Sequence, residues 1–409
     1  MRQSAYLNKF ANLALGALNL QSGQSLAIKV EPENLDAAVT VATQAYRRGA
    51  RYVDLWAESS RMLRSRVDNS EGDHLEFVPG YRQKRNREFL QEKWALLSIK
   101  SPFDPTVMDG ASAARTGAVA RAESIADAEL RRGLSNDETQ WTVMAVPSPK
   151  WASTVLGIPA GEDALNAMWE AIVPILRLDK ENPVEFWHDH GLSLEERARM
   201  LTEMQIRSLR FESPGTDLTV GLSADSVWKG GGAYTTDGKR FAPNIPTEEV
   251  FTTPDFRLTE GRVAISRPVR VYGQLLEGAW MEFRQGRVVN VGARSGLDAL
   301  EAFLDVDPGS RAMGEIALVD STSPIFQSGL LFHNILLDEN AACHFALGFA
   351  YPTCIAGGAS LNDEELEARG ANRSRQHLDF MIGRPETRIT ATLASGSDRT
   401  IMEEGRFVL

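Results

Sequence analysis

The stretch that decides the fold is SLAIKV (25–30), followed by LDAAVTVATQAYRR (35–48) and YVDLW (52–56). The two short apolar runs are typical of strands, and the alanine-rich segment between them predicts a helix that ends at Gly49. Parallel neighbouring strands need a crossover connection, and a strand, a helix and a strand in quick succession provide one. We therefore expect a βαβ unit in a parallel α/β sheet.

Further elements of the same kind lie on both sides of this unit. Residues 1–20 carry apolar side chains at helical spacing, and a long helix is expected over 111–134. The apolar runs 94–99 and 141–146 predict two more strands, with a helical segment at 88–92 before them. This alternation favours a layered α/β domain.

The pattern changes in the second half of the chain. Helices are expected over 163–175 and 194–209, and after them come short apolar runs typical of strands, at 218–222, 263–265 and 269–272. The segment WMEFRQGRVVNV (280–291) predicts a β-hairpin around its central RQGR. Helices are also expected at 297–304 and 341–348. Antiparallel strands should therefore dominate this half.

Length and composition indicate a globular chain of two domains. The chain has 409 residues, of which 43% are hydrophobic and 24% charged, which is too long for one ordinary core. We expect an α/β domain with a parallel sheet over 1–195. An α+β domain rich in antiparallel strands should follow over 196–409.

Charge, hydropathy and cysteine content argue against some kinds of partner and indicate a compartment. A formal net charge of −11 argues against binding nucleic acid, which depends largely on Lys and Arg. No apolar run is long enough to span a membrane. Two cysteines, Cys343 and Cys354, cannot form a disulfide framework, so we expect a cytoplasmic protein.

Acidic and imidazole side chains in the second domain form a candidate metal site. Only six histidines exist in the chain, and two of them, His344 and His377, lie close in sequence to Glu339 and Asp379. His377 and Asp379 would share one face of a strand, being two residues apart. Divalent ions favour this mixture of carboxylate oxygen and imidazole nitrogen. The full candidate set is Glu249, Glu315, Glu339, His344, His377 and Asp379.

Ordinary roles compete for each of these residues. A lone glutamate such as Glu249 is usually a solvated surface residue. Asp338 or Asn340 could simply cap a helix that contains His344. Two glutamates, a Glu/His pair and a His-x-Asp pair within one domain make coincidence improbable, so we favour a site for two ions that activate a water.

Other motifs have plainer interpretations. His188-Asp189-His190 is interpreted as a solvated helix end, and Gly230-Gly231-Gly232 as a flexible loop that borders a cleft. His333 is a weak candidate for supporting the ligands. Cys343 is expected to be a small buried residue rather than a nucleophile.

At these residues the chain resembles the metallo-aminopeptidase family of aminopeptidase T and aminopeptidase S. The resemblance rests on NIPTEEVFTTP (244–254), DENAACH (338–344) and Ser374-x-x-His377-x-Asp379, with weaker motifs at 49–54 and 147–152. It implies that the six candidates are ligands of two divalent ions (zinc, cobalt or manganese), with Tyr351 beside them. It further implies a homodimer that releases amino-terminal residues from short peptides.

The mechanism expected from this resemblance assigns three catalytic residues. Glu315 would bridge the two ions, and either Glu315 or Glu249 would take a proton from the attacking water. Tyr351 would donate a hydrogen bond to the oxyanion.

Two alternatives remain open at this point. Ring-cleaving dioxygenases of the 2,5-dihydroxypyridine type are similar in fold but use one ferrous ion, which here would take His344, His377 and Asp379. That use would leave Glu249 and Glu315 without a role. A catalytically silent binding protein is the third reading.

Overall fold

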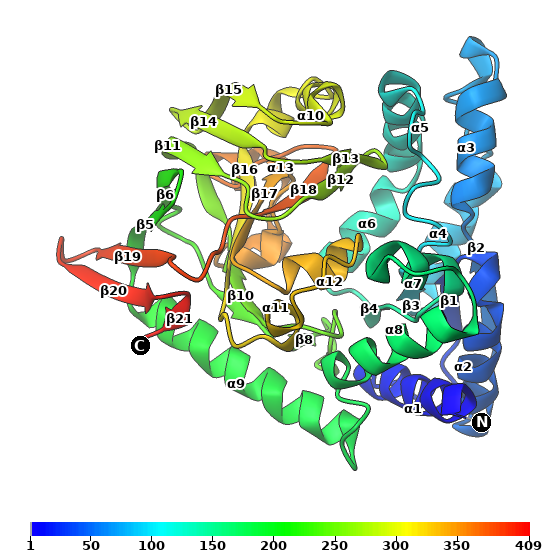
Figure 1. The fold of residues 1–409 in the computed structure, drawn as a ribbon. Helices are drawn as coiled ribbons and strands as arrows, with labels where there is room; N and C mark the ends of the chain where they lie inside the picture. Colours follow the sequence, from blue (N-terminus) through cyan, green and yellow to red (C-terminus); the bar gives the residue numbers. More distant parts are fainter. Residues whose placement is uncertain (1) are drawn as a thin grey trace.

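The chain forms an α/β part built on a parallel sheet and a β-rich part built on two antiparallel sheets (Figure 1). The structure is a computed structural model that describes residues 2–409. The two parts confirm the expected fold class.

The parallel sheet has the strand order β2-β1-β3-β4. Its strands are β1 (Leu26–Val30), β2 (Val53–Ala57), β3 (Ala95–Ile99) and β4 (Trp141–Met144). The helix α2 (Leu35–Arg47) is the predicted crossover between the first two strands, and it packs against α1 (Arg2–Ala17). The quoted stretch 25–56 therefore forms the expected βαβ unit.

One predicted helix is two helices. The expected helix over 111–134 divides into α5 (Ala113–Ala126) and α6 (Ala128–Ser135). Asp127 lies at the break, and its Oδ1 accepts hydrogen bonds from Arg82 Nε at 2.9 Å and Asn86 Nδ2 at 2.7 Å. Both partners belong to another helix, so a tertiary contact fixes the break.

The helix expected over 194–209 also has different bounds. α9 runs from Pro183 to Glu203, with Asn182 as the capping residue and proline in the first turn. Residues after it enter β5 (Ile206–Ser213). The prediction missed the Asn-Pro start signal and extended the helix into a strand.

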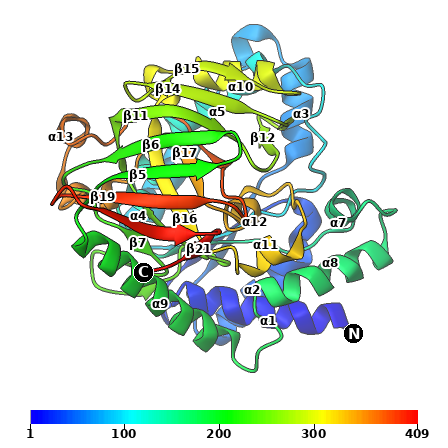
Figure 2. The ribbon, with the colours of Figure 1, turned by 60° about the vertical axis from the view of Figure 1, so that its left-hand side comes forward.

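The β-rich part contains an eight-stranded and a five-stranded antiparallel sheet, and Figure 2 shows the larger one nearly face on. The larger sheet has the order β15-β14-β11-β6-β5-β19-β20-β21, comprising β6 (Thr216–Leu222), β11 (Pro254–Ala264), β14 (Trp280–Arg284), β15 (Arg287–Gly292), β19 (Arg388–Leu393), β20 (Asp398–Glu403) and β21 (Arg406–Phe407) together with β5. The hairpin predicted at 280–291 is β14–β15.

The smaller sheet has the order β18-β17-β16-β10-β7, comprising β7 (Lys229–Gly230), β10 (Glu249–Thr252), β16 (Met313–Val319), β17 (His344–Gly348) and β18 (His377–Met381). The two sheets share one apolar core, in which the rings of Phe283 and Phe345 meet edge to face with centroids 5.9 Å apart.

The helix expected at 341–348 is wrong, because His344–Gly348 is the strand β17. This segment is buried throughout and lies between β16 and β18. A short apolar run in a buried strand has the same pattern as a buried helix, so pairing with its neighbours decides the outcome.

The remaining elements connect or cover these sheets. They are α3 (Ser60–Asn69), α4 (Tyr81–Gln91), α7 (Pro149–Leu156), α8 (Glu162–Ile175), β8 (Ala233–Tyr234), β9 (Arg240–Phe241), β12 (Val269–Val271), β13 (Gln274–Leu276), α10 (Leu297–Leu304), α11 (Pro324–Ser328), α12 (Ile335–Glu339) and α13 (Asp363–Ala368). Among residues 2–409, no helix combines the length and the apolar character that crossing a membrane requires.

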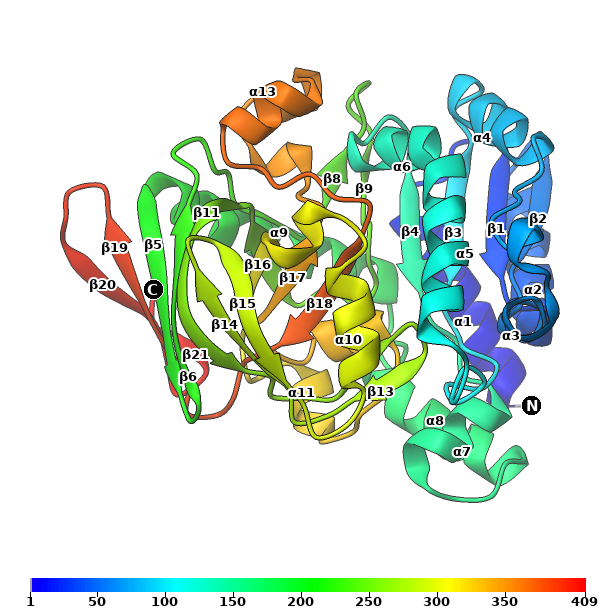
Figure 3. The ribbon, with the colours of Figure 1, turned by 90° about the horizontal axis from the view of Figure 1, so that it is seen from above.

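A short segment joins the two parts, which lie side by side in Figure 3. Val143 of β4 donates its N–H to Pro243 O at 2.7 Å and accepts one from Ile245 at 3.0 Å. Residues 243–245 thus extend the edge of the parallel sheet before the chain enters β10. These residues belong to the second predicted domain, 196–409, yet they pair with a strand of the first. The domain boundary at residue 195 therefore stays a prediction.

Candidate metal centre

Neighbouring strands of the five-stranded sheet bring most of the candidate ligands to one face. In the strand register, Glu315 lies opposite Ala346, which lies opposite Asp379. Directly opposed residues and residues two apart on a strand share a face. His344 is two residues from Ala346 on β17, and His377 is two residues from Asp379 on β18, so both histidines point to the same side. The opposite face carries core residues: Val250, Ile316, Phe345 and Phe380.

Two groups of possible ligand atoms result. Glu249, Glu315 and His344 form one group, and Glu315, His377 and Asp379 form the other, with the ligand atoms of each group within 4.8 Å of one another. Glu315 belongs to both groups. Its carboxylate is therefore within reach of an ion held by either group.

Both imidazoles are oriented in the same way. His344 Nδ1 lies 3.1 Å from Ala342 O, and His377 Nδ1 lies 2.8 Å from Phe349 O. A proton on each Nδ1 donates to these carbonyls and leaves the Nε2 lone pair free. This is the orientation of a metal-binding histidine whose other nitrogen is held by the protein.

The Nε2 atoms face carboxylate oxygens directly. His344 Nε2 lies 3.1 Å from Glu249 Oε2, and His377 Nε2 lies 3.4 Å from Glu315 Oε2 and 3.5 Å from Asp379 Oδ1. With the protons on Nδ1, two acceptors meet at each contact. Glu249 Oε2 is then buried without a hydrogen-bond partner among residues 2–409. A cation between the acceptors would satisfy it, so the donor set fits a metal.

The electrostatics indicate the same shortage of positive charge. Burial raises the pKa of Glu315, and burial together with the neighbouring Asp379 and Glu249 raises the pKa of Glu339 well above its usual range. Burial alone would lower the pKa of His344, but the carboxylate of Glu249 beside it raises the pKa to about 10. Without a metal, the cluster would therefore compensate by holding protons.

Glu339 and Tyr351 lie beside the two groups and line the same cleft. Glu339 ends α12 and belongs to neither group. The Tyr351 ring meets the His377 ring with centroids 5.3 Å apart. Burial and the nearby carboxylates raise the pKa of Tyr351 well above its ordinary value, so its hydroxyl keeps its proton and is able to donate.

The cleft has a volume of about 760 Å³ and receives residues from both parts of the chain. Asp137 and Trp141 come from the α/β part, and Lys229 comes from β7. Gly230, Gly231 and Gly232 also line it, which confirms that the glycine run borders a cleft. Asp137, Trp141 and Lys229 were missed, because only the tertiary fold brings them here.

His190 was also misread, because α9 continues through it. It is half-buried rather than solvated, and its Nε2 lies 3.2 Å from Glu248 Oε2. Arg177 Nη2 lies 2.9 Å from the other oxygen of Glu248. Together they hold the residue that precedes Glu249. A correctly placed Asn-Pro helix start at 182–183 would have indicated that His188–His190 is helical.

Asn340 has a larger role than capping. It is fully buried, accepts the Glu248 N–H through Oδ1 at 2.7 Å, and donates through Nδ2 to Leu336 O at 2.9 Å. It thus joins the start of β10, which carries Glu249, to α12, which carries Glu339. No sequence pattern predicts a link over that separation.

The remaining predictions fall outside the cluster. His333 does not line the cleft, and burial followed by the charge of Arg270 lowers its pKa. Cys343 is 2% exposed, as expected of a buried small residue. Burial raises the pKa of its thiol to about 12, which suits no thiolate nucleophile.

A buried acidic cluster with two oriented imidazoles, open to a cleft between two parts of a chain, is typical of a metal-dependent enzyme. The family model of the thermophilic metalloproteases (M29) matches residues 3–407. The chain belongs to this family and is a metallo-aminopeptidase.

Similar proteins cover almost the whole chain. Aminopeptidase PepS of Streptococcus thermophilus is 36% identical over 405 residues, which are 98% of each protein. Aminopeptidase T of Thermus aquaticus is 37% identical over 405 residues, also 98% of each. The solved structure of wild-type AmpT from Thermus thermophilus is similar with a TM-score of 0.89 and 34% identity, over 98% of this chain and 99% of that one.

Proposed function

We propose that this metallo-aminopeptidase holds two divalent ions and releases amino-terminal residues from short peptides. The ligands are Glu249, Glu315, Glu339, His344, His377 and Asp379. The sharing of Glu315 between two trios of ligand atoms is the observation that carries this proposal.

Charge balance supports two ions rather than one. Three of the carboxylates, those of Glu249, Glu315 and Asp379, are at most 7% exposed, and Glu339 lies beside them. Buried carboxylates need compensating charge. Two divalent ions carry the four positive charges that four carboxylates require, while the imidazoles stay neutral as ligands.

Mixed carboxylate and imidazole ligands suit zinc, cobalt or manganese. When bound, such a pair supplies a water that loses its proton more readily than free water. In this proposal, Glu315 or Glu249 accepts that proton. Tyr351, which keeps its own proton, donates a hydrogen bond to the oxygen that becomes negative on the scissile carbonyl.

A single ferrous ion bound by His344, His377 and Asp379 would fit the geometry less well. His344 faces Glu249 rather than Asp379 as its nearest acid, at 3.1 Å. Glu315 approaches His377 at 3.4 Å and would lie within such a site without binding the ion.

The experiment is a time course of peptide cleavage followed by mass spectrometry. A peptide of about five residues should lose residues one at a time from its amino end, and its amino-acetylated form should resist. A chelator should stop the reaction, and added zinc, cobalt or manganese should restore it. Internal cleavage, or equal cleavage of the acetylated peptide, would refute an aminopeptidase.

A homodimer and a cytoplasmic location are also part of this proposal. The α/β part exposes large apolar side chains, including Leu55 at 47%, Met62 at 72% and Tyr81 at 69%, and a second copy could cover some of them. Cys343 and Cys354 are both free and buried, which suits a reducing compartment. Light scattering after size exclusion should give twice the mass of one chain.

A further inference from the structure

The pairing of β7 with β10 directs one lysine into the cleft near the candidate ligand Glu249. Phe251 of β10 lies directly opposite Lys229 of β7 in this antiparallel pair. Glu249 and Phe251 are two apart and both line the cleft, whereas Val250 between them is 0% exposed in the core. Opposed residues share a face, so the Lys229 side chain lies on the cleft side too.

The ammonium of Lys229 has no bonded partner within the part of the chain that the structure describes. Among residues 2–409, its ammonium has no ion pair within 4.0 Å and no hydrogen bond. Within the described part of the chain, the one other lysine or arginine that lines the cleft is Arg199, which is paired with Glu196 at 2.6 Å and with Glu203. Lys229 is also exposed, so a ligand can reach it.

Asp137 also lines this cleft and carries a carboxylate that senses the charge of Lys229. Its pKa is raised to about 6 by burial, against smaller opposing effects of Trp141 and Lys229. The two charges thus influence each other, yet no ion pair forms between them. Lys229 remains available for an anion that enters with the substrate.

The distance from the candidate ligands suits the far end of a short peptide. Strand geometry separates the Cα atoms of Glu249 and Phe251 by about 7 Å and those of Phe251 and Lys229 by about 5 Å. An extended chain advances about 3.3–3.6 Å per residue, so the carboxylate of a tripeptide lies about 7 Å beyond its first carbonyl. The flexible four-carbon stem of lysine adapts to such a range.

We infer that Lys229 binds the terminal carboxylate of short peptides whose first peptide bond lies at the candidate metal cluster. The inference rests on the proposed aminopeptidase activity and adds its substrate class: peptides of about two to four residues with a free carboxylate. An ammonium facing the cleft would select these over longer or amidated peptides, because only they place a negative charge within its reach.

The test compares a tripeptide acid with the same tripeptide amide. With the metal-loaded full chain, kcat/KM for the acid should be about three to ten times that for the amide. This is the effect expected of a partly screened, charge-assisted contact. Lys229→Met should bring this ratio close to one, and Lys229→Arg should preserve most of it. The wild-type ratio should also fall toward one for a hexapeptide pair.

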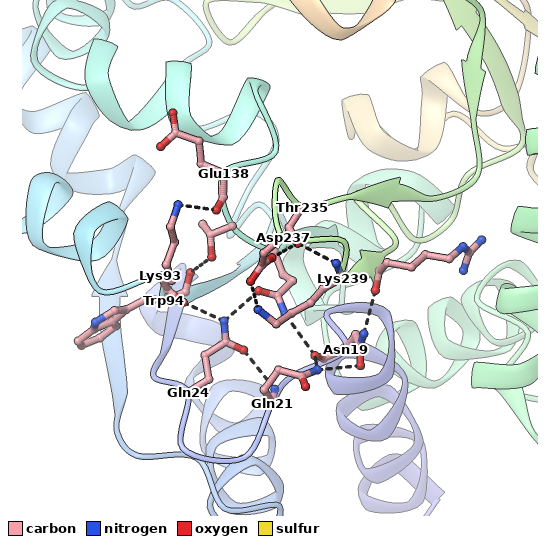
Figure 4. Close-up of polar contacts among 12 residues, drawn as sticks. Asn19, Gln21, Gln24, Lys93, Trp94, Glu138, Thr235, Asp237 and Lys239 are labelled. Carbon is pink, nitrogen blue, oxygen red and sulfur yellow. Dashed lines mark hydrogen bonds and ion pairs between the residues drawn. The ribbon is translucent and has the colours of Figure 1, made fainter. Parts of the chain in front are cut away.

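Lys239→Met is the matched control. Lys239 lies on the neighbouring β8–β9 hairpin, outside the cleft lining, and Figure 4 shows its ammonium bound to Asp237. The hairpin itself is anchored to the α/β part, where Asn19 Nδ2 donates to Arg240 O at 3.0 Å. This control should retain the wild-type ratio.

The outcomes separate the inference from the proposed function. If the wild type cleaves acid and amide equally well, or if Lys229→Met keeps the preference, the inference is wrong while the aminopeptidase stands. If the metal-loaded wild type releases amino acid from neither peptide, the proposed function fails, and the inference fails with it.

Discussion

Replacing Asn340 by alanine should weaken both the fold and the metal site. The change removes the partner of the Glu248 N–H, at 2.7 Å, and the partner of Leu336 O, at 2.9 Å, from a residue that is 0% exposed. Each buried group left without a hydrogen bond costs about 1–3 kcal/mol, so the free energy of unfolding should fall by about 2–6 kcal/mol. The start of β10 would also lose its link to α12.

The loss of that link should lower metal affinity. Residues that orient ligands through hydrogen bonds typically change metal affinity by about 10- to 100-fold when they are removed. Urea denaturation of the metal-free protein measures stability, and competition with a coloured chelator measures affinity for zinc. Both measurements should move together in Asn340→Ala.

Asn334→Ala is the control that separates a general loss of stability from a specific loss of metal affinity. Asn334 is also buried, at 7% exposed, but its amide donates to Lys100 O, directly after β3 of the parallel sheet. It should lose stability through one unsatisfied carbonyl and keep its affinity for zinc. Equal zinc affinity in the two variants would refute the assigned role of Asn340.

Three further predictions follow from other parts of the structure. Glu315→Gln should abolish turnover and reduce metal content, because Glu315 belongs to both ligand groups; full activity with full metal content would contradict this role. Burial opposes the shift, but Lys100 and Lys29 lower the pKa of Glu58 from 4.5 to about 2. The stabilising effect of the Glu58 carboxylate should therefore be complete above about pH 4.5 and be lost as the pH falls through 2. Glu58→Gln should therefore lower the free energy of unfolding in urea at pH 7 by no more than about 1 kcal/mol at this half-exposed site, and leave it nearly unchanged near pH 2; a constant difference would count against the ion pairs. Gly231→Ala places a Cβ 2.2 Å from a backbone oxygen of α9, whereas Gly238→Ala meets nothing within 4 Å, and both have positive φ. Thermal unfolding should show a clearly larger loss for Gly231→Ala, and equal losses would disprove the close contact.

Local patterns were sufficient for the strands and helices whose periodicity agrees with their packing. Residues 25–56 became a βαβ unit because apolar runs and an amphipathic segment already specify it. The failures have tertiary causes. Asp127 breaks a helix through bonds to a neighbouring helix, and residues 344–348 pair as a central strand despite their helix-like composition.

The candidate ligands could be proposed from the sequence, whereas the way the fold brings five of them together could not. The His377-x-Asp379 spacing correctly predicted a shared strand face. Glu249 follows another glutamate and resembles a surface residue, and only the fold shows that it is 6% exposed and faces His344. Lys229 and Asn340 could not be found in advance, because their roles depend on strand pairing and on a contact across 92 positions of the chain.

The most direct test of the account is the number of metal ions per chain in protein reconstituted with zinc, cobalt or manganese, measured together with peptide hydrolysis. The account predicts two ions per chain, with amino-terminal release that reaches its maximum only when both are bound. One iron per chain, with oxygen uptake on a dihydroxypyridine and no amino acid released from peptides, would contradict it.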